Sequence, residues 1–237
     1  GAGIYRHVWL LKTEPVAVDL WGVWVNPQRT AADGWDVPVE TTLRNDSLSP
    51  AKVDVKTAIV DKAGREIASR VDAAEIPIKD KVKLNQLLHV SEPELWDVDA
   101  PNLYTLHTVV SAGGKELDRT ETRFGFRSIY FSAEKGFFLN GKNVKIKGVC
   151  CHQDYGLTGK AMPDRVHRFR LRRLKEMGAN GYRASHYPPA EATMDALDEL
   201  GFLVMDETRW FESTKEGLEQ LAMMLKRDRN RPSVIMW

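Results

Sequence analysis

The sequence lacks the features that mark several specialised classes of protein. Its 237 residues include only two cysteines, Cys150 and Cys151, and neighbouring cysteines rarely close an ordinary disulfide, so the chain is not a disulfide scaffold. No run approaches the roughly 20 apolar residues that span a bilayer, and we expect no membrane partner. Thirty-four Lys and Arg against 33 Asp and Glu give a formal net charge of +1, which offers no electrostatic reason to expect nucleic acid.

The residues that are present describe a globular chain with room for one large or two modest domains. Apolar residues make up 43% of it and charged residues 28%, which is enough apolar material for real hydrophobic cores. The chain begins at Gly1, with neither an initiator methionine nor a signal peptide. We therefore expect a piece of a longer protein. Its compartment cannot be read from the sequence, and a homo-oligomer is compatible with it.

Between residues 16 and 126 the pattern is that of short strands separated by turns. Apolar and polar residues alternate from Trp35 to Arg44, which is typical of a strand with one buried face. Further strands are expected at 52–60, 65–71, 103–110 and 116–126. About seven strands with no helical segment between them predict an immunoglobulin-like β-sandwich. We find no grouping of a nucleophile, a base and an acid in this half, and interpret it as a structural module.

After about residue 128 strands alternate with helices. Strands are expected at 143–151, 180–184, 202–206 and 233–237, and helices at 164–177, 188–200 and from 213 to about 225. This alternation indicates βαβ units and a parallel sheet. The second half therefore predicts the first four β/α units of a TIM (β/α)8 barrel. The expected domains are 1–12, 13–127 and 128–237.

The helices are expected to turn apolar side chains toward the sheet. These residues are Val166, Phe169, Leu174 and Met177, then Met194, Leu197 and Leu200, then Leu218, Leu221 and Leu225. The run Ser213 to Glu216 has the form of a capping box. The first helix also carries a series of cations, Arg165, Arg168, Arg170, Arg172, Arg173 and Lys175. Without interleaved aromatic residues they are interpreted as a solvated outer face, and no nucleic-acid partner is predicted.

Polar residues follow three successive strands of the expected barrel. They are His152, Gln153 and Asp154, then Arg183, Ser185 and His186, then Asp206 and Glu207. Active sites of parallel barrels lie at the carboxyl ends of the strands, so these residues predict a polar rim suited to a hydroxyl-rich ligand such as a sugar. Each also has a structural interpretation, because Arg183 could neutralise Asp206 or Glu207 beneath the site, and a single histidine is more often structural than catalytic.

The same strand ends carry residues of the types that bind zinc. Cys150 and His152 lie two apart on one face of a strand, and His186 could approach them. Zinc sites need a fourth ligand and a recognisable paired spacing, which this set does not offer. No metal and no cofactor are therefore predicted from the residues.

Several motifs, in order along the chain, resemble glycoside hydrolase family 2, the family of β-galactosidases, β-glucuronidases and β-mannosidases. They are Gly125-Phe126-Arg127, Phe138 to Lys142, Lys147 to Asp154, Arg183 to Pro189, Met205-Asp206-Glu207 and Arg227 to Trp237. The stretch Leu95 to Leu106 is similar to the end of that family's immunoglobulin-like domain, and Gly3 to Arg6 is similar to the end of its preceding jelly-roll domain. The local sequence around His152 and His186 most resembles that of bacterial β-galactosidases.

The resemblance implies a fragment of a retaining exo-glycosidase that hydrolyses terminal β-D-galactosides in carbohydrate metabolism. Two glutamates do this chemistry in the family, one as acid/base and one as nucleophile. The resemblance puts both of them beyond Trp237, so it implies no catalytic residue in this chain and no activity of the chain alone. The residues that it assigns to the substrate are His152, Asp154, Arg183, His186, Asp206 and Glu207.

The resemblance leaves other functions open and argues against a metal. Family members with a divalent metal carry Glu and His shortly after their Asp-Glu pair, where this sequence has Phe211 and Ser213. A β-glucuronidase or β-mannosidase of the same family is the first alternative. A non-catalytic carbohydrate-binding or interaction module is the second.

Overall fold

The computed structural model describes residues 3–31, 34–210 and 212–237, which form two compact units. One unit, called here the sandwich unit, comprises residues 11–94 and 102–126. The other, called here the barrel unit, comprises residues 1–10, 95–101 and 127–237. Residues 95–101 therefore leave the sandwich in the middle of its sequence and fold with the barrel unit. The domain division expected from the sequence stays a prediction.

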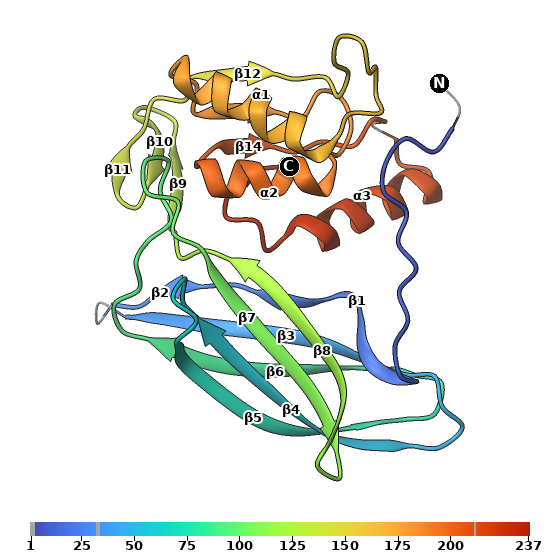
Figure 1. The fold of residues 1–237 in the computed structure, drawn as a ribbon. Coiled ribbons are helices and arrows are strands. Elements are labelled where there is room, and N and C mark those ends of the chain that lie inside the picture. The colour runs from blue at the N-terminus through green and yellow to red at the C-terminus, as the bar shows by residue number, and fades with distance from the viewer. Residues whose placement is uncertain (1–2, 32–33, 211) are drawn as a thin grey trace. The chain divides into compact units, whose positions relative to one another are not determined.

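The sandwich unit consists of two antiparallel sheets (Figure 1). In the first sheet, β3 (Trp35–Asn45) pairs with β1 (Val16–Val25), with the short β2 (Gln28–Arg29) and with β6 (Lys81–Val90). The second sheet has the order β5 (Glu66–Ile76), β4 (Ala51–Val60), β7 (Tyr104–Ala112) and β8 (Lys115–Phe124). The immunoglobulin-like β-sandwich expected from the alternating pattern is confirmed.

The core of the sandwich follows directly from that alternation. Every second residue of β3, from Trp35 to Asn45, is buried, because successive side chains of a strand point to opposite faces. An aromatic cluster closes one part of the core, where the ring of Phe126 lies 4.9 Å from Tyr104 and 5.6 Å from Trp35. The buried polar residues inside are neutral, and one pair is formed where Thr57 donates to Gln86 over 2.5 Å.

The barrel unit contains a parallel sheet with the order β12 (Gly148–Cys150), β13 (Gly181–Arg183), β14 (Leu203–Met205) and β15 (Val234–Met236). The connections between these strands contain α1 (Asp164–Glu176), α2 (Glu191–Leu200) and α3 (Lys215–Asp228) (Figure 1). Buried apolar residues from strands and helices, among them Leu171, Leu197, Phe202 and Val204, form its core. The β/α order predicted for this half is confirmed.

The first strand of that sheet is shorter than predicted. Lys142–Asn143 is a separate strand, β11, which pairs with β10 (Gly136–Leu139). β10 also pairs with β9 (Ile129–Ser132), so a small antiparallel sheet precedes the parallel one. The sequence prediction merged β11 and β12 because both lie in one apolar-rich run, and the prediction of a single strand over 143–151 is wrong.

The buried faces of α1 and α3 also differ from the prediction. In α1 the buried residues are His167 and Leu171, whereas Phe169 is 48% exposed and Met177 is 76% exposed. In α3 they are Gly217, Met224 and Asp228, and Leu218 is exposed. Successive residues of an α-helix are rotated by about 100°, so a small shift in position turns a different face toward the sheet. The predicted faces were chosen from apolar residues alone, whereas the buried faces also contain polar residues. In α2, Met194 and Leu197 are fully buried as predicted.

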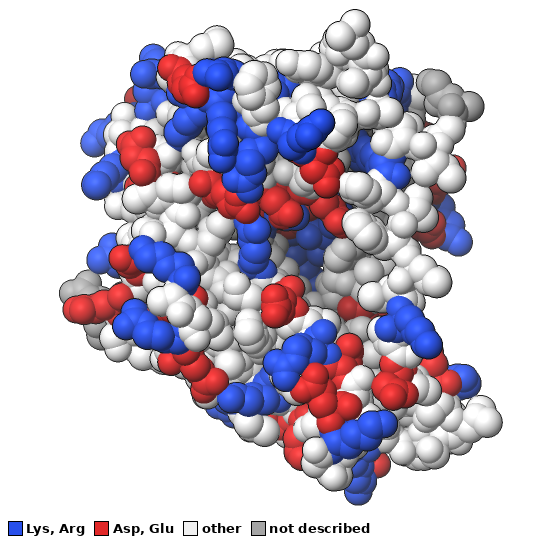
Figure 2. Space-filling view, in the orientation of Figure 1, with Lys and Arg blue, Asp and Glu red and all other residues white. Residues whose placement is uncertain are grey.

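Three of the six cations of α1, namely Arg168, Arg170 and Lys175, are less solvated than predicted, whereas Arg165, Arg172 and Arg173 are exposed. Lys175 donates to the carbonyl oxygens of Val98 and Gly201, and Arg170 donates to that of His152 over 2.7 Å. Others form ion pairs, such as Arg173 with Glu176. Over the face drawn in Figure 2, Lys and Arg side chains are interspersed with Asp and Glu. Within the described ranges, no helix is long and apolar enough to cross a membrane.

Residues 95–101 are anchored in the barrel unit by a buried indole. Trp96 is fully buried, and its Nε1 donates to the carbonyl of Asp198 near the end of α2 over 2.9 Å. That helix ends at Gly201, whose φ of +70° is left-handed. A Cβ at Gly201 would lie 2.3 Å from the carbonyl oxygen of Val98. Glycine is therefore required both for the helix end and for the close approach.

Candidate functional site

Strand register brings the predicted site residues to one edge of the parallel sheet. Cys150 is level with Arg183, and Arg183 is level with Met205. Because the strands are parallel, the residues that follow them leave the sheet at the same carboxyl edge. His152, His186 and Glu207 all follow these strand ends.

Glu207 is the centre of a hydrogen-bonded cluster at this edge. Its Oε2 accepts from Nε of Arg183 over 3.0 Å, and its Oε1 lies 2.9 Å from Nδ1 of His186. The Glu207 side chain is 14% exposed, compared with 43% for Arg183 and 54% for His186. The hydrogen bond to Glu207 raises the pKa of Arg183. A largely buried anion thus holds two more exposed groups in place.

The Glu207 carboxylate also determines which nitrogen of His186 carries the proton. An ionised carboxylate can only accept, so Nδ1 of His186 must donate to Oε1. In the neutral ring Nε2 is then left as an acceptor. The ring of His152 lies 5.3 Å from that of His186, at an interplanar angle of 80°. Four of the six predicted substrate residues therefore lie together.

Asp154 is on a loop beside this cluster. Together with His152, Tyr155, Gly156, Leu157 and Gly159 it lines an open pocket of about 720 Å³. The backbone of the loop is tethered to α1, because Nη1 of Arg170 donates to the carbonyls of His152 and, at 3.4 Å, of Asp154. Among the described residues, the hydrogen bonds of the Glu207 cluster do not include the Asp154 carboxylate.

Asp206 lies beneath the cluster, with its side chain turned inward. It is fully buried, and its Oδ1 accepts from the backbone N–H of Glu207 over 3.0 Å. Burial, followed by the nearby charge of Asp228, raises the pKa of Asp206 to about 7. In this arrangement Asp206 supports Glu207 from below, and a direct contact with substrate stays a prediction for this residue.

Gln153 is likewise buried, at 5% exposure, although it was expected at the rim. Its Nε2 donates to the carbonyls of Pro188 over 2.9 Å and Tyr187 over 3.4 Å. It therefore joins the loop after β12 to the loop after β13. Ser185 is also buried, at 1% exposure.

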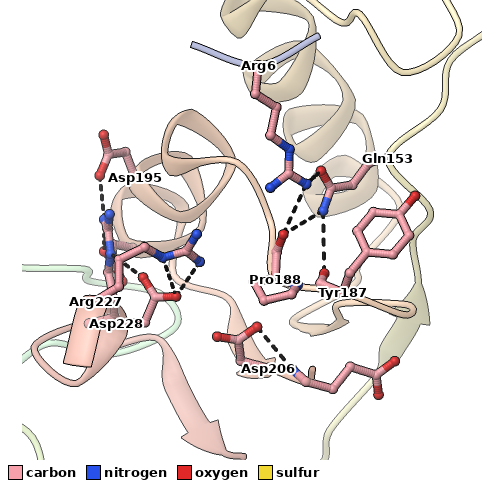
Figure 3. A network of polar contacts seen from close by, with 11 residues as sticks. Arg6, Gln153, Tyr187, Pro188, Asp195, Asp206, Arg227 and Asp228 are labelled. Atoms are coloured by element: carbon pink, nitrogen blue, oxygen red, sulfur yellow. Dashed lines mark hydrogen bonds and ion pairs between the residues drawn. The ribbon is translucent and has the colours of Figure 1, made fainter. Parts of the chain in front are cut away.

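A second group of buried charges was not predicted from the sequence. Asp198 accepts from Arg231 over 2.9 Å and from the Ser233 hydroxyl over 2.6 Å. Asp228 accepts from Nε of Arg227 over 2.9 Å (Figure 3). Burial alone would lower the pKa of Arg231, but Asp198 and Asp195 more than offset this and raise it. The available signal was the dense run of charges from 227 to 231, shortly before β15.

The residues offer little for a metal. Of the two positions compared with metal-binding members of the family, Phe211 lies outside the described residues and Ser213 is exposed. Within the part of the chain that the structure describes, no three His, Cys, Asp or Glu side chains are arranged to hold an ion.

The fold and the polar strand ends define a barrel-type module preceded by a β-sandwich. Family models match both parts. The model described as "Glycosyl hydrolases family 2" matches residues 18–127, and the model for the "TIM barrel domain" of the same family matches residues 132–215. The chain belongs to glycosyl hydrolases family 2.

The individual relatives have two kinds of name. A β-galactosidase of Bacteroides ovatus is 41% identical over all of this chain and 29% of its own length. A β-glucuronidase of Bacteroides fragilis is 26% identical over 99% of this chain and 36% of its own length. Among solved structures, a family 2 member from Bacteroides cellulosilyticus superposes with a TM-score of 0.94 at 40% identity, over 100% of this chain and 33% of that one. The chain spans about a third of the length of these relatives.

Proposed function

We propose that this chain forms part of a retaining glycosidase that acts on terminal β-D-galactosides. The observation that carries the proposal is the cluster in which Glu207 holds Arg183 and His186 at the carboxyl edge of the parallel sheet, beside His152. The β-galactosidase of Bacteroides ovatus, at 41% identity, supports galactoside as the substrate class.

In this proposal the cluster binds sugar hydroxyl groups. The guanidinium of Arg183 can only donate, and Nε2 of neutral His186 can accept, so neighbouring hydroxyls find both kinds of partner. His152 supplies a second imidazole 5.3 Å away. Glu207 fixes the direction of both side chains that it holds, so that little reorganisation is needed when the sugar binds.

The bond-breaking groups lie elsewhere in the proposal. A retaining mechanism needs an acid/base and a nucleophile whose carboxyl groups are about 5–5.5 Å apart. By resemblance, both glutamates follow Trp237, and Glu207 is neither of them. The 237-residue chain by itself is therefore expected not to hydrolyse glycosides.

A β-glucuronidase is the second candidate. Relatives with that name cover nearly the whole chain, and the Bacteroides uniformis β-glucuronidase superposes with a TM-score of 0.91 at 28% identity. The residues of the cluster suit any hydroxyl-rich pyranoside, so the choice of sugar rests on the relatives alone. A β-mannosidase and a non-catalytic carbohydrate-binding module are the remaining alternatives.

A panel of nitrophenyl glycosides tests the proposal on the complete gene product. The β-galactoside should be cleaved fastest, with retention of anomeric configuration by NMR. Preference for the β-glucuronide or β-mannoside would establish the corresponding alternative, and binding of sugars without turnover would establish the binding module. For the isolated chain, hydrolysis well above that of a Glu207→Ala variant would contradict the expected inactivity.

Arg183→Ala in the same protein tests the role of the cluster. Because Arg183 supplies charged hydrogen-bond donors to the site, kcat/KM should fall about 10- to 100-fold. The sandwich unit should remain folded, as judged by hydrogen exchange. Kinetics like those of the wild type would show that Arg183 lies outside the working site.

A further inference from the structure

The segment before the sandwich reaches the candidate site through one arginine. Nη2 of Arg6 donates to Oε1 of Gln153 and, over 3.0 Å, to the carbonyl oxygen of Pro188 (Figure 3). Gln153 donates to that same carbonyl over 2.9 Å. Three groups that are remote in the sequence thus share one set of hydrogen bonds.

The hydrogen bonds of Arg6 are partly shielded from water. Gln153 is only 5% exposed, so its amide oxygen has little access to water and needs a protein donor. Burial of the Arg6 guanidinium lowers its pKa, yet arginine stays charged at neutral pH. The guanidinium carbon also lies 6.0 Å from the centroid of the Tyr187 ring. One cation therefore satisfies two oxygens and lies against an aromatic side chain.

The two loops that Arg6 joins are the loops that carry the histidines of the cluster. Gln153 directly follows His152, and Tyr187 and Pro188 directly follow His186. The two imidazole rings lie 5.3 Å apart. A displacement of either loop would change that separation and the hydrogen bond from His186 to Glu207.

We propose that Arg6 is a positioning residue, which holds the His152 loop and the His186 loop at the spacing that the sugar site requires. The effect on catalysis rests on the proposed glycosidase function, whereas the effect on the loops does not. Arg6 itself has no assigned contact with substrate, and it acts through Gln153 and Pro188.

The neighbouring residue provides a matched control. His7 contacts Asp164 at the start of α1 over 3.0 Å, and both side chains are more than half exposed. His7→Ala therefore loosens the same segment without touching either loop. Arg6→Lys keeps the charge but replaces the forked donor with a single ammonium, so it should restore part of the effect.

The experiment compares Arg6→Ala, Arg6→Lys and His7→Ala in the complete gene product. Hydrogen exchange is followed in peptides covering 150–156 and 184–190, with 191–205 as the folding control. Arg6→Ala should speed exchange in both loops at least about tenfold, because it removes two hydrogen bonds, and leave the control peptide unchanged. His7→Ala should leave both loops as in the wild type.

Activity on the best glycoside of the panel supplies the second readout. Arg6→Ala should lower kcat about 10- to 100-fold with a smaller change in KM, since misplaced groups cost more in the transition state than in binding. The kcat of Arg6→Lys should lie between that of Arg6→Ala and that of the wild type. The proposal is wrong if the loops exchange normally in Arg6→Ala, if His7→Ala loosens them equally, or if kcat is unchanged despite loosened loops. A wild type with no activity would remove the glycosidase function, and the exchange data would still decide the role of Arg6 in the loops.

Discussion

The two units bury different kinds of polar group. Buried polar residues of the sandwich unit are neutral, namely Thr41, Asn45, Thr57, Gln86 and Thr108. Among the described residues of that unit, no Asp, Glu, His, Lys or Arg is buried. The barrel unit buries His167, Asp198, Asp206 and Asp228.

This difference distinguishes the sandwich unit, which is interpreted as a structural module, from the barrel unit, which carries the candidate site. Burying an ion costs several kcal/mol in desolvation, and a well-packed apolar group would often be more stabilising. The sandwich unit avoids that cost and is held by apolar packing. The barrel unit accepts it, and its buried carboxyls include Asp206, directly behind Glu207. Perturbed ionisable groups gather where chemistry is done, which agrees with the placement of the candidate site.

The largest expected effect comes from removing a buried charge. Asp198→Ala leaves Arg231 and Ser233 without their shared partner, and a broken buried pair costs about 3–5 kcal/mol. The loss should fall on the barrel unit and appear as faster hydrogen exchange in α2 and β15, with β3 unaffected. Glu75→Ala is the control, because the Glu75 pair with Lys52 is largely exposed and should contribute about 0–1 kcal/mol. Equal effects of both changes would contradict the comparison.

The sandwich unit should instead be sensitive to volume. Leu106→Ala deletes a fully buried side chain in β7 and should cost about 2–5 kcal/mol, measured as faster exchange in β4 and β7. Ile67→Ala in β5, where the side chain is 38% exposed, should change stability by about 0.5 kcal/mol. If exchange in the sandwich were unaffected by Leu106→Ala, apolar packing would not be what holds this unit.

Stability of the barrel unit should depend on pH through Asp206. Its pKa is raised from 3.8 to about 7, so the folded state favours the protonated carboxyl. That contribution is fully present below pH 3.8 and is lost as the pH rises to about 7, by at most about 1.4 kcal/mol per pH unit for one proton. Denaturant titrations between pH 4 and pH 8, in about one-unit steps, should show a flatter profile for Asp206→Asn. Parallel profiles for variant and wild type would rule out this role.

The smallest expected effect concerns the start of α3. The hydroxyl of Thr214 accepts from the backbone N–H of Gly217 over 3.1 Å, so Thr214→Ala should cost about 1 kcal/mol. Ser213→Ala should have little effect, because Ser213 lies before the cap residue. If Ser213→Ala lowered stability more than Thr214→Ala, as measured by hydrogen exchange in α3, Ser213 would be the cap residue, as the capping box in the sequence predicted.

Patterns of burial were predictable where one face of an element is uniformly apolar. The strict alternation in β3 and the apolar face of α2 are of this kind, and both are confirmed. In α1 and α3 the buried face includes His167 and Asp228, and an apolar count cannot identify a face that contains charges. The prediction of one strand in place of β11 and β12 failed because the chain passes from one sheet to another there without a change in its hydropathy pattern.

The candidate site was predictable through one rule and no further. Polar residues after parallel strands share an edge, which accounts for His152, Arg183, His186 and Glu207. Whether the next residue points outward depends on the path of the loop, so the burial of Gln153 was not foreseen. Arg6 lies 147 residues from Gln153 in the sequence, and no local pattern could connect them.

The position of Trp96 limits which segments of this protein can be exchanged by recombination. Its codon lies inside the stretch that encodes the sandwich unit, yet its buried indole belongs to the barrel unit and donates to Asp198. A recombination that exchanged residues 11–126 as one block would replace segment 95–101 of the barrel unit with that of another protein. The two units are therefore expected to be passed on together, and a viable chimera has to keep residues 95–101 with the barrel from which they came.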